Sequence, residues 1–119
     1  MFESIIESIP KIELLEKRDE IWRVLKNEVL PIMRKQHGFL EFLTFTPEIK
    51  NERFISITLW ADKKDVERNE KEVFPKVEEI MKPYLAAPLT SRHYTVETTL
   101  CEHLRERTGR LIPRYLFLA

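Results

Sequence analysis

Glycine is scarce in this sequence, which has only Gly38 and Gly109 among its 119 residues. No tract rich in glycine, serine or proline interrupts the chain, so no segment has the composition of a flexible linker between domains. A chain of this length normally forms one domain around one core. We therefore predict a single folded unit.

Cysteine, net charge and long apolar runs are scarce as well. Cys101 is the only cysteine and cannot form an internal disulfide, which favours a reducing environment. Basic and acidic residues balance at 20 each, so no overall charge draws the chain to nucleic acid or to an anionic membrane. No run is apolar and long enough for a signal peptide or a membrane span. We expect a cytoplasmic protein with neither a nucleic-acid nor a membrane partner.

Apolar and charged residues are abundant, at 43% and 34% of the chain, which supports a globular core and argues against disorder. Between residues 18 and 37 the apolar side chains recur every three or four residues, and this spacing predicts a helix with one buried stripe. Pro31 should kink or tighten that helix, and Gly38 supplies a left-handed stop after it. The stripe consists of Ile21, Val24, Leu25, Val29, Ile32 and Met33.

Two strands are predicted next, at residues 39–45 and 54–60. The first, FLEFLTF, is rich in aromatic and aliphatic side chains. The second, FISITLW, alternates, so that its odd positions form an aliphatic face and its even positions form a mixed face. The polar turn between them favours a hairpin.

A second helix is predicted for residues 63–84 and a last strand for residues 92–98. Asp62 can cap the first amides of the helix, and Asp65 adds negative charge near its positive end. Pro75 is acceptable only in a first helical turn, so the helix should consist of two pieces. In the last strand, Tyr94 and Val96 alternate on what should be the apolar face.

The first strand is the least defined element, because the N-terminal apolar residues have helical spacing and a short extended run follows them. We place this strand at residues 10–15. The chain is then an α+β protein of ferredoxin-like βαββαβ order, with both helices on one face of a four-stranded antiparallel sheet. The other face, made of either the even or the odd positions of residues 54–60, is too apolar for water, so we predict a homodimer that covers it.

Residues 99–119 are predicted to form a C-terminal helix and an apolar arm that belong to the same unit as the domain at residues 1–98. Thr99 and Glu102 have the spacing of a capping box at the start of that helix. Cys101 and His103 lie close together here, but a metal site needs more converging ligands. We predict no metal site.

Four segments resemble the antibiotic biosynthesis monooxygenase domain of the dimeric α/β barrel superfamily. They are QHGFLEFLTF, NERFISITLWADKKDVER, VFPKVEEIMKPYL and HYTVET. The shared pattern is a helix that ends at Gly38 and Phe39, a strand that ends at Trp60, a charged helix and a closing strand with an aromatic residue. The resemblance covers about residues 21–98. It implies a dimeric α/β barrel and, in one branch, oxygenation of quinol-like aromatic substrates without a cofactor.

Such chemistry needs an apolar pocket and a few polar groups that deprotonate the substrate and hold the anion. His93 can act as a general base because the charge of histidine changes near neutral pH. The candidates near strand ends and helix junctions are His93 and Asn69 as catalytic residues, and Trp60, Tyr94 and Arg92 as substrate-binding residues. No cofactor is implied.

Each candidate also has a purely structural interpretation. Trp60 can wedge between sheet and helix, and Tyr94 can fill the core. His93 can be a solvated residue at a strand end, and Asn69 lies where the second helix breaks, a place where asparagine is common.

Two functions follow from this balance. One is a cofactor-independent monooxygenase that acts on a small aromatic or polyketide-like substrate. The alternative is a non-catalytic homodimer that binds a small hydrophobic ligand or only assembles. An open apolar cavity that contains His93 or Asn69 would favour the enzyme, whereas a core filled with large side chains would exclude it.

Overall fold

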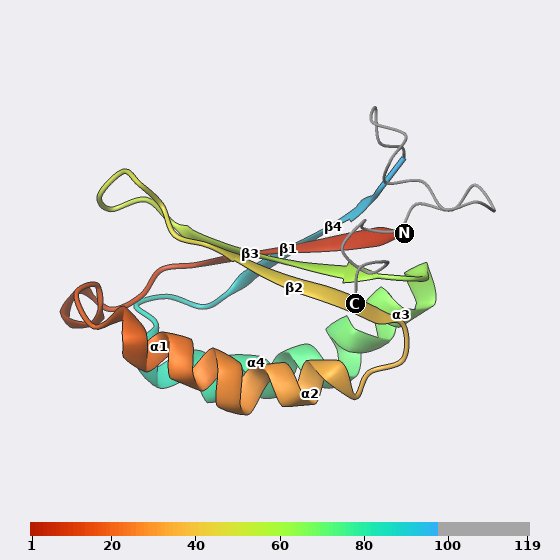
Figure 1. The fold of residues 1–119 in the computed structure, drawn as a ribbon, viewed down its shortest axis with the longest axis horizontal. Coiled ribbons are helices and arrows are strands. Elements are labelled where there is room, and N and C mark those ends of the chain that lie inside the picture. The colour runs from red at the N-terminus through yellow and green to blue at the C-terminus, as the bar shows by residue number, and fades with distance from the viewer. Residues whose placement is uncertain (98–119) are drawn as a thin grey trace, which may run out of the picture.

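A four-stranded antiparallel sheet lies above two long helices in the computed structural model, which describes residues 1–97 (Figure 1). The strand order is β2-β3-β1-β4, and every neighbouring pair is antiparallel. The predicted ferredoxin-like βαββαβ fold is therefore confirmed. The strands are β1 (Phe2–Ser8), β2 (Phe39–Phe45), β3 (Phe54–Trp60) and β4 (Thr90–Thr95).

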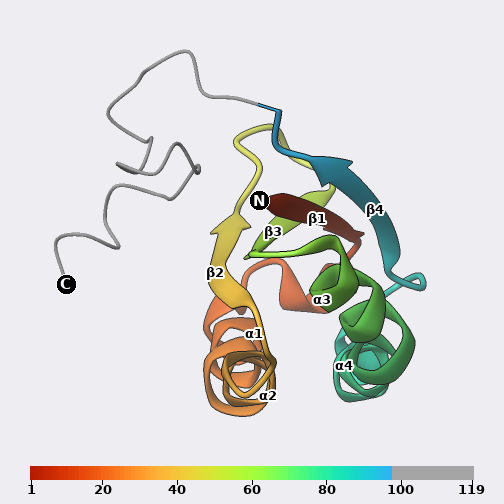
Figure 2. The ribbon, with the colours of Figure 1, turned by 90° about the vertical axis from the view of Figure 1, so that its right-hand side faces the viewer.

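Each long helix consists of two α-helical segments joined by a π-helical turn. The first helix lies below β2 and the second lies on the side of β1 and β4 (Figure 2). Short 3₁₀ turns, η1 (Ile12–Leu14) and η4 (Lys82–Tyr84), precede the first helix and follow the second. The first helix is α1 (Arg18–Val24), η2 (Leu25–Val29) and α2 (Leu30–Arg34), and the second is α3 (Lys63–Arg68), η3 (Asn69–Val73) and α4 (Phe74–Met81).

A proline follows each π turn and explains it. Pro31 and Pro75 have no amide hydrogen, so neither can donate the usual helical bond to the carbonyl four residues earlier. The helix widens by one residue just before each proline, at η2 and η3. We predicted that Pro31 would kink or tighten its helix. The second alternative, a tighter turn, is wrong, because the π turn is wider than an α-helical turn. The predicted two-piece second helix is confirmed.

The predicted position of the first strand is wrong. We expected it at residues 10–15, but β1 occupies Phe2–Ser8, and a 3₁₀ turn at Ile12–Leu14 fills most of the expected range. The helix-facing positions of β1 include Ser4, which is only 2% exposed. A small hydroxyl residue in the core does not register as apolar alternation, and for this reason the strand was missed.

The helix-facing side of the sheet holds the core. Trp60 is fully buried at the end of β3, and its ring meets the ring of Phe39 edge-on at a centroid distance of 5.5 Å. The indole Nε1 donates to the hydroxyl of buried Thr58 at 2.9 Å. The buried apolar residues that pack with Trp60 are Val24, Val29, Met33, Val66, Val73, Val77 and Met81.

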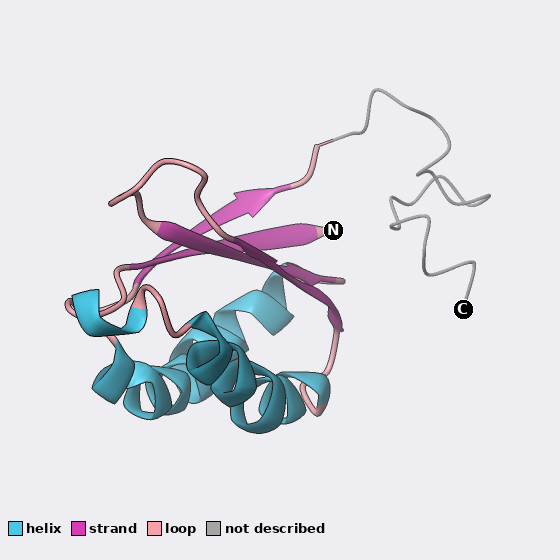
Figure 3. Ribbon diagram, turned by 60° about the vertical axis from the view of Figure 1, so that its left-hand side comes forward, coloured by secondary structure: helices cyan, strands magenta, loops and turns pink. Residues whose placement is uncertain are grey.

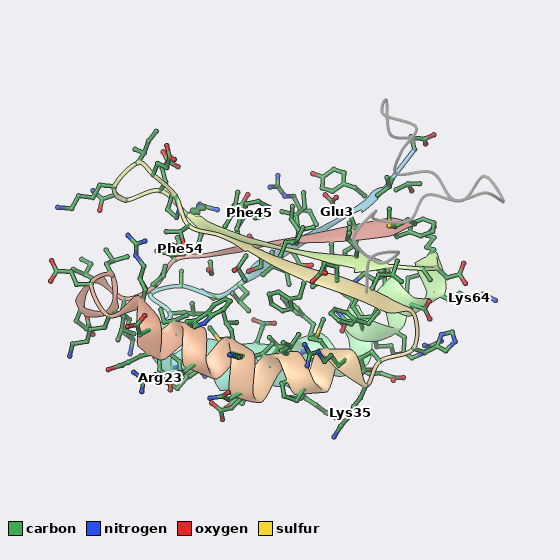
Figure 4. The ribbon with its side chains drawn as sticks, viewed as in Figure 1. Glu3, Arg23, Lys35, Phe45, Phe54 and Lys64 are labelled. Atoms are coloured by element: carbon green, nitrogen blue, oxygen red, sulfur yellow. The ribbon has the colours of Figure 1, made fainter. Side chains whose placement is uncertain are left out.

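The other side of the sheet carries no helix or strand from residues 1–97 (Figure 3). Strand register shows that the odd positions of β3 are on this open face, and Glu3 and Phe45 also lie there (Figure 4). The question left open by the sequence is thus answered, since the aliphatic face of β3 is the uncovered one. Leu43 and Phe45 are 39% and 47% exposed.

Three smaller predictions meet the structure differently. Asp62 precedes α3, but its side chain makes no capping hydrogen bond. Tyr94 does not fill the core, because it pairs with Glu3 on the open face and is 46% exposed. The predicted C-terminal helix and arm at 99–119 lie outside the described residues. No helix within residues 1–97 is long and apolar enough to cross a membrane.

Gly38 gives a direct test of the junction between the first helix and β2. Its φ is 78°, and a Cβ there would overlap the carboxylate of buried Asp65. We expect Gly38→Ala to lower the free energy of unfolding by about 1 kcal/mol for the left-handed backbone, and by at least about 1 kcal/mol more for the displaced carboxylate. Urea denaturation measures the change.

The matched control is Asn51→Ala. Asn51 has a φ of 72° in the exposed β2–β3 turn, so this change adds the backbone cost without a buried carboxylate nearby. Equal losses in the two variants would show that contact with Asp65 does not matter.

Candidate functional site

A cavity of about 260 Å³ lies between the helix-facing side of the sheet and the two helices. It is mostly apolar, and its polar atoms belong to a few hydroxyl groups, one asparagine and one pair of charged residues. The helix side chains that line it include Trp22, Leu25, Val29, Met33, Phe74, Val77 and Met81, and those from the strands include Ile6, Phe42, Thr44, Phe54 and Ser56. An apolar space with few polar groups is typical of a small-molecule site.

Asn69 is the polar side chain buried most deeply against this cavity. It lies at the first position of η3, is 4% exposed and lines the cavity. Its Oδ1 is buried and has no hydrogen-bond partner. A buried acceptor without a partner is unfavourable by about 1–3 kcal/mol, so a ligand that donates a hydrogen bond would relieve this cost.

The π turn directs two consecutive side chains to different places. Asn69 contacts the cavity, whereas Glu70 binds two residues of β4. The Oε2 atom of Glu70 lies 2.8 Å from Nε2 of His93 and accepts a 3.2 Å hydrogen bond from the hydroxyl of Ser91. Ser91 in turn lies 3.3 Å from the hydroxyl of buried Ser4. This cluster ties the π turn to the edge of the sheet.

The two predicted catalytic residues, Asn69 and His93, do not meet at the cavity. Asn69 lines the cavity, and His93 does not. Glu70, the next residue after Asn69 in the sequence, binds the imidazole of His93. His93 and Glu70 both retain substantial exposure, at 36% and 40% of their side chains. The proton-accepting role predicted for His93 is therefore not supported by direct contact with the cavity.

The three predicted substrate-binding residues do not line the cavity. Trp60 is enclosed by the core, in agreement with its structural interpretation. Tyr94 and Arg92 lie on the open face of β4. There Arg92 and Arg53 both donate to the carboxylate of Glu7, so a chain of charges runs across the open face.

Two contributors to the site were missed by sequence reasoning. Trp22 lines the cavity although it is 54% exposed. Its helical spacing of three and seven residues from Leu25 and Val29 could have placed it on the same face of the helix. Glu70 was missed because its partner His93 is 23 residues away and only the folded sheet brings them together. Within residues 1–97, no group of three or more His, Cys, Asp or Glu side chains is placed to hold a metal ion.

A second ionisable cluster lies at the junction of α3 with β2. Burial alone would raise the pKa of Asp65, but Nδ1 of His37 lies 2.9 Å from its Oδ1 and the guanidinium of Arg68 donates to the same oxygen at 3.2 Å. These contacts outweigh burial, and the pKa of Asp65 is lowered below its ordinary value of 3.8. His37 thus pairs with α3 while its own side chain stays exposed.

Solved structures with this architecture are numerous. A monooxygenase from the gene ActVA-Orf6 of Streptomyces coelicolor, in complex with the ligand nanaomycin D, has a TM-score of 0.66 and 12% identity over 84% of this chain and 90% of that one. SnoaB, a cofactor-independent oxygenase of Streptomyces nogalater, has a TM-score of 0.60 and 14% identity over 83% and 95%. Another antibiotic biosynthesis monooxygenase has a TM-score of 0.58 and 16% identity over 82% and 100%.

The chain has the fold of the antibiotic biosynthesis monooxygenases. The resemblance noted in the sequence is confirmed at this level. No protein-family model matches the sequence, and no curated protein matches it. At such low identity the likeness concerns the fold, and the reaction must be argued from the cavity.

The lowered pKa of Asp65 predicts a pH dependence of stability. A carboxyl group whose folded pKa lies below its unfolded pKa stabilises the fold above the unfolded value, and this contribution is lost as the pH falls through the folded value. We expect Asp65 to contribute to a decline of the urea midpoint as the pH falls below about 4. Asp65→Asn should remove part of this decline, while Asp62→Asn, at an exposed residue without a capping bond, should not. Identical pH profiles for the two variants would contradict the assignment.

Proposed function

We propose that this protein is a cofactor-independent monooxygenase of the antibiotic biosynthesis type, acting on a small aromatic or polyketide-like substrate. The observation that carries the proposal is Asn69, a buried polar residue that lines an apolar cavity and whose Oδ1 has no hydrogen-bond partner. The architecture shared with SnoaB and with the nanaomycin D complex supports the same reaction class.

The reaction fits a site made only of protein side chains. An activated CH₂ group next to an aromatic ring loses a proton, and the resulting carbanion transfers electrons to O₂. One oxygen atom becomes the new carbonyl and the other leaves as water with the two hydrogens, so that R₂CH₂ and O₂ give R₂CO and H₂O. The substrate supplies all of the electrons. An apolar cavity assists because it removes water from the anion and from its oxygenated intermediate.

Asn69 is assigned to bind the substrate oxygen, which carries most of the negative charge after deprotonation. Its carboxamide can turn to donate to that oxygen or to accept from the neutral hydroxyl. His93 remains a predicted catalytic residue, and Glu70 connects it to the turn that holds Asn69. Trp60 belongs to the core behind the residues that line the cavity. Tyr94 and Arg92 lie on the open face, and we propose that they contribute to function only through that face.

A second function is favoured by one specific observation. Among the described lining residues there is no histidine, lysine or tyrosine, and the charged members are Arg18 and Asp19. A cavity without a general base beside its buried polar group is suited to binding a small hydrophobic ligand without turnover. The alternative is therefore a non-catalytic ligand-binding protein of the same fold.

Asn69→Ala separates these functions when anthrone is the probe. If the protein is an oxygenase, it should consume O₂ with anthrone and form anthraquinone, and the variant should lose about tenfold or more in kcat/KM, as expected for one lost hydrogen bond in a dry site. Asn27→Ala is the matched control, because Asn27 is the exposed asparagine of the equivalent π turn.

The other outcomes decide the alternative. Binding of anthrone that depends on Asn69, followed by calorimetry, but without O₂ uptake would favour the non-catalytic protein. If anthrone neither binds nor reacts, and Asn69→Ala behaves as wild type in both assays, the cavity is not a site for such molecules. His93→Gln should lower kcat at constant affinity if His93 takes part in proton transfer.

We also propose that the protein is a homodimer joined through the open faces of its two sheets. The aliphatic positions of β3 and the half-exposed Leu43, Phe45 and Tyr94 lie on this face. An apolar sheet face of this kind is unfavourable in water, and a second copy covers it with the same residues.

Leu43→Glu tests the dimer. Leu43 pairs with Ile57 at the middle of the open face, so a carboxylate there would be buried against aliphatic side chains. Sedimentation should show a wild-type dimer and a dissociation constant raised at least about 100-fold in the variant. Ile12→Glu, at an 82% exposed apolar residue outside the sheet, should sediment as wild type. A wild-type monomer at micromolar concentration would contradict the proposal.

A further inference from the structure

The cavity extends along the first helix. On the first helix its lining residues recur at three- and four-residue steps from Arg18 through Trp22, Leu25 and Val29 to Met33. Arg18 and Met33 are 15 residue steps apart, so at about 1.5 Å per step the stripe extends roughly 22 Å. A volume of about 260 Å³ spread along such a length forms a channel between the helices and the sheet.

The two ends of the channel differ in chemistry. At the inner end, on the side of α2 and α3 (Figure 1), Asn69 lines the channel, and its Oδ1 has no hydrogen-bond partner. At the outer end, near the start of α1, the lining includes exposed Arg18 and Asp19, its only charged residues among those described. The intervening walls are apolar apart from a few hydroxyl groups. The buried hydrogen-bonding group thus lies at one end and the opening to solvent lies at the other.

Trp22 stands at this opening. Its side chain lines the channel and yet is 54% exposed, whereas the other tryptophan of the chain, Trp60, is fully buried. A tryptophan at the rim of an apolar channel offers a large flat surface that a ligand can cover. Phe54 lines the channel near the same end, where α1 begins (Figure 4).

We propose that the channel binds an elongated, largely apolar molecule with a single hydroxyl head, which inserts head first to Asn69 and lies with its far end against Trp22. This inference rests on the proposed function and specifies its ligand. Asn69 selects the hydrogen-bonding head, the length of the channel selects the apolar tail, and Trp22 is the residue that distinguishes long ligands from short ones. A compact ligand would reach Asn69 but leave the outer half of the channel unused.

A series of para-alkylphenols measures the length of ligand that the channel accepts, since ethyl, butyl, hexyl and octyl members share one hydroxyl head. Each methylene that enters the channel should tighten binding about threefold to fourfold, as expected for burial of a CH₂ group. We expect this gain, measured by calorimetry, to continue from ethyl to octyl. A gain that stops at butyl would overturn the proposal.

Tryptophan fluorescence reports where the tail ends without any need for turnover. Excited where phenols do not absorb, Trp22 should be quenched by iodide in the free protein, and octylphenol should shield it while ethylphenol should not. The Trp22→Phe variant leaves only buried Trp60, so its residual emission is subtracted as the background. Trp22→Ala should weaken the binding of octylphenol about tenfold and leave the binding of ethylphenol unchanged.

The outcomes distinguish this inference from the function on which it rests. If ethylphenol binds in an Asn69-dependent manner but octylphenol neither gains affinity nor shields Trp22, the elongated ligand is refuted and the site stands. If Trp22 stays open to iodide while octylphenol binds tightly, the tail leaves by another route and the role of Trp22 is refuted. If no phenol binds, the elongated ligand is refuted, and the anthrone assay alone decides the proposed function.

Discussion

Small hydroxyl side chains interrupt the larger residues on the helix-facing side of the two central strands, and the cavity, which Ser56 lines, depends on this. Ser4 on β1 and Ser56 and Thr58 on β3 occupy positions where a core would normally hold large aliphatic residues. The larger aliphatic side chains of β3 point the other way. Helices packed over serine and threonine leave a space that helices packed over isoleucine would fill. The same alternation therefore opens a cavity on one face and exposes an apolar surface on the other.

Such hydroxyl groups are acceptable in a core because partners satisfy them. Thr58 accepts from the indole of Trp60, and Ser4 lies within hydrogen-bond distance of Ser91. Asn69 differs from both, since its Oδ1 has no partner among the described residues. The contrast assigns different roles to polar groups of similar burial. Ser4 and Thr58 have partners within the core, whereas Asn69 lines the cavity with an acceptor that has none.

Pro75 explains the π turn in which Asn69 lies. In a regular helix, the line of buried side chains formed by Val66, Asn69, Val73 and Val77 would turn slowly around the helix axis. The extra residue of the π turn changes the angular position of the side chains before Pro75. The result is that Asn69 stays in the buried stripe while Glu70 reaches β4. Replacement of Glu70 would free the turn from the sheet edge without touching the cavity wall. Two neighbouring residues thus have different roles: Asn69 supplies the carboxamide, and Glu70 attaches the turn to the sheet.

Much of this could be predicted from the sequence, and the failures have physical causes. Strands β2 and β3 were predicted correctly because their side chains are β-branched or aromatic and a polar turn separates them. Strand β1 was misplaced since its core position is a serine, and pattern reading expects an apolar residue there. Asn69 was found through the helix interruption, yet its burial could not be inferred. The cavity itself and the contact between Glu70 and His93 arise from packing across distant segments, which no local pattern encodes.

The open face has the layout expected of an interface between protein chains. Its middle row pairs Leu43 with Ile57 and Ile57 with Ile5, while Glu3 and Glu41 lie in a flanking row. Glu7, in the other flanking row, is already bonded to Arg53 and Arg92. A second sheet could thus cover the aliphatic centre without leaving Glu7 as an unpaired buried charge, and an apolar centre with a polar rim is the usual anatomy of such contacts. Since β3 forms both this centre and the floor of the cavity, assembly of two copies would hold that floor rigid beneath the ligand.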